Sequence, residues 1–365
     1  MILDFRLPIF DSGINLMHTT LLKLFLNSSS DNRKSKIENL KWLGLSVIAS
    51  VLVVTEAVAT AQQPTKIPRI GYLGGTSPSV DSARTEAFRQ GLRELGYVEG
   101  KNIVIEYRYS EGKLDRDRAF AAELMRLKVA VIVTGGSTST RAAKEATATI
   151  PIVMTQDPDP IGNGFVASLA RPGGNITGLS NLGPELSGKR LELLKEVVPR
   201  LTRVAVFGTS TFPGNAQILR ETERAAGALR VQLQYLDVLD PKDMETAFRG
   251  ASKARAEAVL VLAGPVFTSQ RTQLATLAVK SRLPAISYAT EFVEDGGLMT
   301  YGANRADLAR RAATYVDKIL KGAKPADLPV EQPKKFEFII NLKAAKQIGL
   351  TIPPNVLVRA DKVIK

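Results

Sequence analysis

The sequence lacks cysteine altogether and has a single histidine, His18, among its 365 residues. Without cysteine there can be no disulfide, no thiolate metal site, no cysteine nucleophile and no lipid-modified cysteine anchor. His18 lies in an N-terminal stretch that we expect to be removed, which also excludes a Ser-His-Asp triad and the commonest zinc and copper sites. Most hydrolase chemistry is therefore disfavoured, and we expect no metal ion or other cofactor. Carboxylate or lysine catalysis stays open.

Long apolar runs are lacking as well. The run Trp42–Val54 has 13 residues, which is short for a membrane-spanning helix. It is preceded by the basic residues Arg33, Lys34, Lys36 and Lys41. It is followed by Ala59-Thr60-Ala61, a small-x-small cleavage site. This order is typical of a secretory signal peptide. We therefore expect residues 1–61 to be an N-terminal extension and signal peptide cleaved near Ala61, which would leave a soluble, unanchored chain in the periplasm.

Aromatic residues make up 6% of the chain, and the one tryptophan, Trp42, lies in the predicted signal peptide. Aromatic contacts in a binding cleft would have to come from Tyr72, Phe212, Phe267, Tyr288 or Tyr301, although most of these are more typical of a core or a strand edge. The net charge is +13, but Lys and Arg alternate with acids along the predicted helices. Because no basic block is interleaved with aromatics, we expect no nucleic-acid binding.

From residue 69 onward, short apolar stretches alternate with longer amphipathic ones. The pattern predicts strands at residues 69–73, 103–109, 129–133, 150–154, 204–207, 231–236, 258–262, 285–288, 298–301 and, as the final strand, 336–340. It predicts helices at residues 82–95, 116–127, 141–148, 187–198, 216–229, 241–251, 269–281 and 306–320, with a short helical pattern at 165–169. Such alternation is typical of parallel sheets with helices on both faces. We therefore expect an α/β fold of two doubly wound parallel-sheet lobes.

The alternation divides into two series near Thr177. We assign residues 66–177 plus 303–330 to the first lobe. Residues 178–302 plus 331–365 are assigned to the second lobe and the hinge return. The helix at 306–320 is placed in the first lobe because its strand, at 298–301, follows the completed second series.

Four predicted strand ends are rich in glycine and small polar residues. They are Gly75-Thr76-Ser77, Gly136-Ser137-Thr138, Thr209-Ser210-Thr211 and Gly264-Pro265-Val266. Such loops offer backbone N–H groups, hydroxyls and helix N-termini to a polar or anionic ligand. Any one of them could simply begin and cap a helix. Four of them facing one crevice favour a ligand site.

Residues 150–180 contain a second indication of a ligand site. The strand at 150–154 ends in Asp157-Pro158-Asp159-Pro160, where the prolines stop the strand and two carboxylates follow it. Ligands of open α/β sheets bind in the crevice outside the carboxyl ends of strands. Asp157, Asp159, Glu291 and Glu294 could form an acid–base pair, hold a hard metal ion, bind a substrate ammonium or cap loops. Given the other loops, we favour binding of an ammonium or another polar group over catalysis.

Several longer stretches are specific enough to indicate a family. They are residues 69–73 (RIGYL), 88–102 (FRQGLRELGYVEGKN), 159–162 (DPIG), 168–178 (SLARPGGNITG) and 296–302 (GGLMTYG). They resemble the ABC-transporter substrate-binding protein family related to the tryptophan- and tyrosine-binding proteins, and the resemblance covers essentially all of residues 66–365. It implies a type I periplasmic-binding-protein fold, in which two lobes joined by a three-segment hinge enclose a ligand.

The resemblance also implies which loops face the ligand. Together with the strand-end glycines, the candidate ligand-binding residues are Gly75, Thr76, Ser77, Gly136, Ser137, Thr138, Asp157, Asp159, Ser210, Gly264, Pro265 and Glu291. The chain departs from the family's usual acid-Pro form at Gly264, where Asp is common. Loss of a carboxylate from the cleft would weaken recognition of an amine.

We therefore expect a non-enzymatic, extracytoplasmic solute receptor of an ABC importer. It would close by hinge motion around a small polar ligand, an amino acid or a related compound. The expected partners are that ligand and a membrane permease, and the protein is expected to be a monomer. Two alternatives stay open: an exported α/β enzyme that uses the cleft carboxylates, and a sensory ligand-binding domain.

Overall fold

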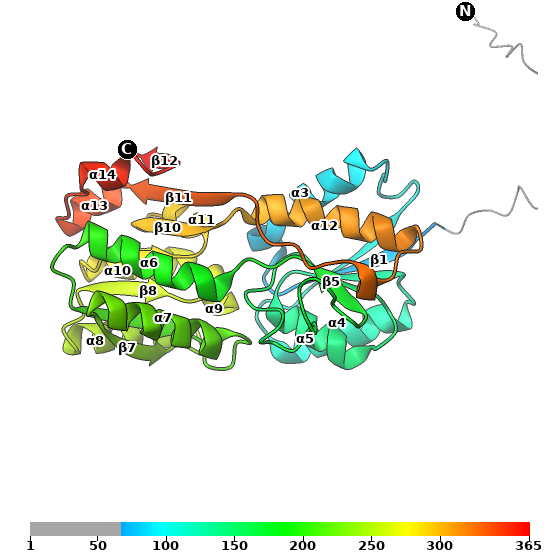
Figure 1. Cartoon of the computed structure of the whole chain (residues 1–365), viewed down its shortest axis with the longest axis horizontal. Coiled ribbons are helices and arrows are strands. Elements are labelled where there is room, and N and C mark those ends of the chain that lie inside the picture. The colour runs from blue at the N-terminus through cyan, green and yellow to red at the C-terminus, as the bar shows by residue number, and fades with distance from the viewer. Residues whose placement is uncertain (1–66) are drawn as a thin grey trace, which may run out of the picture. The chain divides into compact units, whose positions relative to one another are not determined.

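The structure, a computed structural model, describes residues 67–365, and this unit is drawn in colour in Figure 1. The predicted signal peptide and its cleavage site lie outside these residues. The unit contains a five-stranded sheet in the order β2-β1-β3-β4-β5 and a seven-stranded sheet in the order β12-β11-β10-β9-β8-β6-β7. We call the part built around the five-stranded sheet the first lobe and the part built around the seven-stranded sheet the second lobe.

The first lobe has a parallel sheet with helices on both faces. Its elements are β1 (Arg69–Gly74), α3 (Pro78–Glu94), β2 (Val104–Tyr109), α4 (Leu114–Arg126), β3 (Val131–Thr134), α5 (Ser137–Ala146), β4 (Ile152–Met154), β5 (Ile176–Gly178) and the returning helix α12 (Arg305–Leu320). Alternate residues point to opposite faces, as the strand period requires. Ile70 and Tyr72 pack with α3 and α12, whereas Leu73 and Ile132 pack with α4 and α5. Both faces of the sheet are thereby buried.

The second lobe repeats this construction with more strands. Its elements are α6 (Gly183–Val197), β6 (Arg203–Gly208), α7 (Asn215–Leu229), β7 (Gln232–Asp237), α8 (Asp243–Lys253), β8 (Ala258–Val261), α9 (Pro265–Ser269), α10 (Arg271–Lys280), β9 (Ala285–Ser287), α11 (Thr290–Glu294), β10 (Met299–Ala303), β11 (Phe336–Asn341), α13 (Leu342–Ile348), α14 (Pro354–Leu357) and β12 (Lys362–Ile364). Val204 and Val206 face α6 and α7, and Ala205 and Phe207 face α8 and α10. All pairs are parallel except β10 with β11.

The chain crosses between the lobes three times. The crossings join β5 to α6, β10 to α12, and the 3-10 turn η1 (Pro325–Asp327) to β11. Hydrogen bonds tie them together, because the Ser180 amide donates to the Glu331 carbonyl at 2.9 Å and the Asn304 amide donates to the Lys335 carbonyl at 3.0 Å. The three crossings therefore form one hydrogen-bonded connection.

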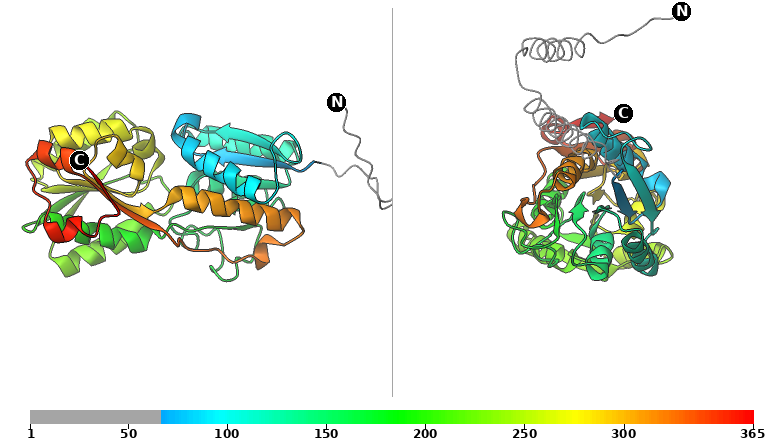
Figure 2. Two further views of the ribbon diagram at one scale, coloured as in Figure 1. Left: turned by 90° about the horizontal axis from the view of Figure 1, so that it is seen from above. Right: turned by 90° about the vertical axis from the view of Figure 1, so that its right-hand side faces the viewer.

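Helix α12 returns to the first lobe, where it lies beside α3 (Figure 2). The two helices approach closely at Gly91, since a Cβ atom built there would lie 2.3 Å from the Arg310 carbonyl oxygen. The Tyr97 hydroxyl adds a hydrogen bond to Asp317 at 3.0 Å. Side chains of α12 are therefore part of the core beside β1 and α3.

The predicted fold of two doubly wound lobes joined by a multi-segment hinge is confirmed, but some element predictions are wrong. The helical pattern at 165–169 forms an irregular loop with bends instead, in which Phe165 and Val166 pack with residues of β3 and β4. Helix α3 begins at Pro78 rather than Ser82, since Ser77 serves as its N-cap. The helix predicted at 269–281 is α10, which begins at Arg271, and the short helix α9 before it was not predicted. Strand β11 is not the last one, because β12 pairs beside it.

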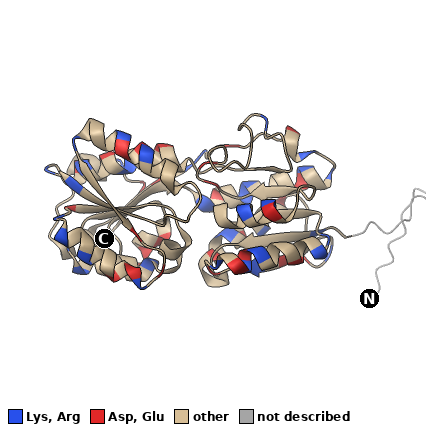
Figure 3. Cartoon of the chain, turned by 90° about the horizontal axis from the view of Figure 1, so that it is seen from below, with Lys and Arg blue, Asp and Glu red and all other residues tan. Residues whose placement is uncertain are grey.

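Within residues 67–365, every helix is too short or too polar to cross a bilayer. Lys and Arg are interspersed with Asp and Glu over the helices of both lobes (Figure 3). Neither lobe shows a face of one charge sign in this view.

Candidate ligand-binding site

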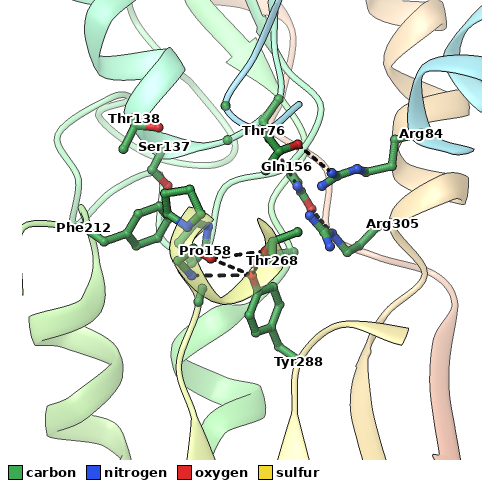
Figure 4. A pocket seen from close by; sticks show the side chains of 17 residues that line it. Thr76, Arg84, Ser137, Thr138, Gln156, Pro158, Phe212, Thr268, Tyr288 and Arg305 are labelled. Carbon is green, nitrogen blue, oxygen red and sulfur yellow. Dashed lines mark hydrogen bonds between the residues drawn. The ribbon is translucent and has the colours of Figure 1, made fainter. Parts of the chain in front are cut away.

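A cavity with a volume of about 50 Å³ lies between the lobes, at the carboxyl ends of strands from both sheets (Figure 4). The first lobe and the crossings line it with Gly75, Thr76, Arg84, Gly135, Gly136, Ser137, Thr138, Gln156, Pro158, Asn181 and Arg305. The second lobe lines it with Phe212, Ala263, Gly264, Pro265, Thr268 and Tyr288. The crevice position predicted from the α/β alternation is therefore the position of the cavity.

Two loops of the first lobe present backbone and hydroxyl groups to the cavity. Thr76 follows β1, and Ser137 and Thr138 form the first turn of α5, which has no side-chain cap. The N–H groups of a helix's first turn have no partner within the helix and carry a partial positive charge. This end of α5 is therefore suited to a polar or negatively charged group.

Arg84 lies on α3 and is fixed by buried neighbours. It forms an ion pair with Asp81 at 2.7 Å, and both side chains are almost fully buried. Asp81 also accepts a hydrogen bond from the Tyr72 hydroxyl at 2.8 Å, and Arg84 donates to the Thr76 hydroxyl at 3.4 Å. Burial opposes the charge on Arg84, but the combined attraction of Asp81 and the neighbouring Tyr72, Glu291 and Tyr288 outweighs it, and the pKa of the guanidinium is raised. Arg84 is thus a fixed cation, and its Nε has no hydrogen-bond partner.

Arg305 is the first residue of α12 and lies where the chain crosses between lobes. Its Nε donates to Gln156 Oε1 at 3.0 Å, and its Nη1 lies 3.5 Å from a carboxylate oxygen of Glu291. Its guanidinium also lies over the ring of Tyr288, 5.6 Å from the centroid. Figure 4 shows Arg84 and Arg305 on the same side of the cavity, next to Thr76 and Gln156. Arg305 therefore contacts both lobes at once.

The second lobe supplies a smaller set of polar groups. The Tyr288 and Thr268 hydroxyls lie 2.6 Å apart, and the Tyr288 hydroxyl also lies 3.4 Å from the Gly264 carbonyl oxygen. Burial raises the pKa of Tyr288, so its hydroxyl stays protonated. The rest of this wall consists of Phe212, Ala263 and Pro265, whose side chains offer no hydrogen bonds.

A smaller cavity of about 20 Å³ adjoins the first and shares Pro158, Asn181, Ala263, Tyr288 and Arg305 with it. Its distinguishing residue is Arg190 of α6, which is 4% exposed. The Nε of Arg190 donates to the Tyr301 carbonyl oxygen at 2.7 Å. Burial lowers the pKa of Arg190 to about 10, which still leaves it charged at neutral pH.

The lobes touch beside the cavity. A Cβ atom built on Gly214 would lie 3.3 Å from Pro158 Cγ, and one built on Gly112 would lie 3.7 Å from Pro265 Cβ. A water molecule needs roughly 10–15 Å³ of such space, so the cavity holds only a few waters in this conformation. A ligand as large as an amino acid would require the lobes to move apart.

Seven of the residues predicted from the sequence line the cavity: Gly75, Thr76, Gly136, Ser137, Thr138, Gly264 and Pro265. Five others lie outside its lining: Ser77, Asp157, Asp159, Ser210 and Glu291. Ser77 caps α3, Asp159 accepts from the Gly162 amide at 2.8 Å, and Ser210 donates to Asp237 at 2.5 Å. Glu291 reaches the site only through Arg305.

Asp157 is fully buried, and its oxygens are occupied within the first lobe. It accepts hydrogen bonds from the Ser137 hydroxyl at 2.6 Å, the Asn163 amide group at 2.9 Å and the Asp159 backbone amide at 3.0 Å. Burial raises the pKa of Asp157 to about 6, although these hydrogen bonds act in the opposite direction. Asp157 therefore holds the first turn of α5 against the loop after β4.

Sequence reasoning missed the three arginines and Gln156. Among residues 67–365, no group of three or more His, Cys, Asp or Glu side chains is placed to hold a metal ion. A sequence signal existed for Arg84, because residues 81, 84, 88, 91 and 92 form the buried stripe of α3 and two of them are charged. Arg190 likewise occupies a buried position between Ser187 and Leu191 on α6. A charged residue at a position in the apolar stripe of its helix was therefore the sequence feature that could have indicated both arginines.

The family model described as ABC transporter substrate binding protein matches residues 76–364. The chain belongs to the ABC transporter substrate-binding protein family. This is a family of solute-binding proteins that act outside the cytoplasm.

Among individual relatives of this substrate-binding protein, the tyrosine-binding protein of Clostridioides difficile is 26% identical over 275 residues, 75% of this chain and 78% of the relative. A conserved domain protein from Vibrio cholerae is 28% identical with a TM-score of 0.78. An ABC domain from Streptococcus pneumonia in complex with L-Trp is 27% identical with a TM-score of 0.77. Both crystal structures cover 82% of this chain and are themselves covered completely.

Proposed function

We propose that this substrate-binding protein is the solute receptor of an ABC importer and takes up a small polar ligand, an amino acid or a related compound. The observation that carries the proposal is the cavity enclosed between two lobes that three crossings connect. Seven residues predicted from the sequence line that cavity, and we assign ligand contact to them together with Arg84, Arg305 and Tyr288.

Binding would proceed by hinge closure. Each lobe has its own buried cores, so it moves as a unit, whereas the crossings lie between elements and can absorb changes in backbone angles. Polar groups from both lobes can contact one ligand only when the lobes are close together. A ligand therefore favours the closed state because it gains contacts there that the open state does not offer.

The names of the relatives support an amino acid or a similar compound as the general class of ligand. One relative is named for tyrosine, and one solved structure holds L-Trp. Identities of 26–28% leave most residues around the cavity free to differ. We therefore propose an amino acid or a compound of similar size and polarity as the ligand.

The proposal includes a cellular setting. The chain would be exported by the signal peptide of residues 1–61, cleaved near Ala61, and would act in the periplasm as a monomer. Its closed form would dock on a membrane permease, which an ATPase drives from the cytoplasm.

A thermal-shift screen of the chain from Gln62 to Lys365 tests this function. The screen compares amino acids, organic acids, purines and small sugars. A compound that binds the folded state alone stabilises it by about 2.7 kcal/mol at a hundredfold excess over its Kd. We expect one class to raise the unfolding midpoint and the compound to be recovered unchanged after incubation. Consumption of the compound would instead indicate an enzyme, and no shift with any class would overturn the proposal.

A further inference from the structure

The charged side chains that line the main cavity and its smaller neighbour are all arginines. Arg84 and Arg305 line the first, and Arg190 and Arg305 line the second. No Asp or Glu is among the residues that line either of these two cavities in the described part of the chain. The space that a ligand would fill is therefore bounded by positive charge alone.

The three arginines differ in whether a nearby carboxylate balances their positive charge. Asp81 pairs with Arg84 at 2.7 Å, and Glu291 lies 3.5 Å from Arg305. Arg190 has no carboxylate within ion-pair distance anywhere in residues 67–365, and its Nε is tied to the backbone at Tyr301. A buried charge is costly unless an opposite charge pairs with it. The positive charge of Arg190 is therefore not balanced by a nearby carboxylate of residues 67–365.

Two more features favour a negative group. The first turn of α5, which has no side-chain cap, lines the main cavity with its N–H groups unpaired within the helix and with the hydroxyl of Thr138. The smaller cavity of about 20 Å³ has space for one or two waters, which is also the space that the oxygens of one carboxylate need.

The described residues that line the two cavities also offer no negative charge to an ammonium group. The oxygens of Asp157 are occupied by Ser137, Asn163 and the backbone of Asp159. Glu291 faces Arg305 and lies outside the lining. An amino acid could place its carboxylate here, but its ammonium would be desolvated beside arginines with no carboxylate to offset it.

We propose that the ligand is a small organic acid that carries a carboxylate and no ammonium group, with the carboxylate held between Arg190 and Arg305. This inference rests on the proposed function and narrows its ligand class to acids related to amino acids. The rest of the molecule would lie in the main cavity, between the hydroxyl-bearing loops of the first lobe and Phe212 and Tyr288 of the second.

Matched ligands that differ in one group test the inference by isothermal titration calorimetry. The first set is 3-phenylpropanoate, L-phenylalanine and 3-phenylpropanamide, and the second is 4-methylpentanoate, L-leucine and 4-methylpentanamide. In at least one set, we expect the acid to bind at least tenfold more tightly than both the amino acid and the amide. An amino acid that binds more tightly than its matched acid, or an absence of binding by both acids, overturns the inference.

Arg190→Gln removes the uncompensated charge, and Arg190→Lys is its matched control. We expect Arg190→Gln to reduce the acid-over-amide preference to less than threefold, while Arg190→Lys keeps at least part of it. A preference that is unchanged in Arg190→Gln overturns the role of this residue.

Gly264→Asp tests the same idea without touching the arginines, in case Arg190→Gln does not fold. Gly264 lines the cavity, and its φ of 175° is an extended conformation that any residue adopts. A Cβ atom there would lie 3.2 Å from Thr209 Oγ1, so the neighbours need to shift by only a few tenths of an ångström. We expect the added carboxylate to reverse the preference toward the amino acid, and an unchanged preference for the acid would contradict the inference.

The proposed receptor function and the proposed ligand class can be overturned by different results. If an uncharged or cationic compound from the wider screen binds and is recovered unchanged, the receptor function stands and the acid inference falls. If no compound of any class binds, both fall.

Discussion

The first lobe contributes charged and hydrogen-bonded side chains to the cavity, whereas the second contributes mostly small or apolar ones. Arg84, Ser137 and Gln156 are each held by neighbours of their own lobe. On the opposite wall, Ala263, Gly264 and Pro265 offer backbone and little else. The two lobes share a doubly wound architecture, so this difference arises in the loops and not in the fold.

We infer from this difference that the two walls of the cavity have different roles in ligand binding. Groups that are already fixed lose little conformational freedom when a ligand arrives, so the first lobe is prepared to recognise it. The wall of the second lobe formed by Phe212, Ala263, Gly264 and Pro265 would then act as a cover that excludes water. Two arginines are exceptions. Arg190 of the second lobe lines the adjoining smaller cavity, and Arg305 contacts Gln156 on one side and Glu291 and Tyr288 on the other. Substitutions on the two sides of this contrast should differ in their effect, from Arg305→Gln, the largest, to Phe212→Ala, the smallest.

Arg305→Gln should have the largest effect. It removes a charge that we propose contacts the ligand, and it also removes the link between the lobes. Losing one partner of a largely buried charge pair costs about 2–5 kcal/mol. We expect the affinity for the ligand identified in the screen to fall at least a hundredfold in calorimetry. Arg310→Gln is the control, because Arg310 lies on the same helix but pairs with Glu94 at the surface. Binding by Arg305→Gln within threefold of the wild type would show that Arg305 is not part of the site.

The lobes also differ in their buried acids, since the described carboxyls with raised pKa values, Asp81, Asp117 and Asp157, all lie in the first lobe. Asp117 accepts from the Ser139 hydroxyl at 2.9 Å, but its second oxygen has no partner. Burial raises its pKa from 3.8 to about 6. The folded state therefore holds this proton more tightly, and the resulting stability is full below about pH 4 and lost as the pH rises through 6.

Asp117→Asn should remove this pH dependence. The free energy of unfolding of the wild type, minus that of the variant, should fall by up to about 3 kcal/mol between pH 4 and pH 7. Urea unfolding at several pH values measures the difference. Asp115→Asn, an exposed change on the same helix, should leave it flat. A flat difference for Asp117→Asn as well would mean that folding does not raise the pKa of Asp117.

Phe212→Ala should have the smallest effect, because it alters the covering wall. We expect a loss of affinity of about fivefold, roughly 1 kcal/mol, that appears mainly as faster ligand dissociation in stopped-flow measurements. Phe120→Ala is the control, since Phe120 is half-buried on α4 outside the cavity. A loss as large as that of Arg305→Gln would show that the second lobe recognises the ligand and does not only cover it.

The sequence predicted the loops of this site better than its helices. Thr76, Ser137 and Gly264 follow apolar strands, and the crevice position of strand ends follows from the fold class alone. Arg84 and Arg190 were missed because arginines in an amphipathic helix are normally read as part of its solvent-exposed face. Their burial depends on partners that are distant in the chain or on a cavity, and neither is visible in local periodicity.

At the Asp-Pro-Asp-Pro turn, by contrast, the sequence predicted residues of the site that do not line the cavity. Two carboxylates after a strand predict groups that face a ligand, but the chain there has donors of its own to satisfy. The Asp159 amide, the Asn163 side chain and the Ser137 hydroxyl all donate to Asp157, and so the carboxylate turns inward. A buried polar group is paired first with what lies nearest, and sequence alone does not reveal which donors those are.

The three crossings also decide when the molecule can fold. The core of the first lobe includes side chains of α12, which ends at Leu320, and the sheet of the second lobe needs β11 and β12, which ends at Ile364. The first lobe therefore cannot complete its core until Leu320 has been synthesised, and the second lobe cannot complete its sheet until Ile364 has been. Both lobes of a chain built in this way can complete their cores only late in synthesis, although the first lobe begins near residue 69.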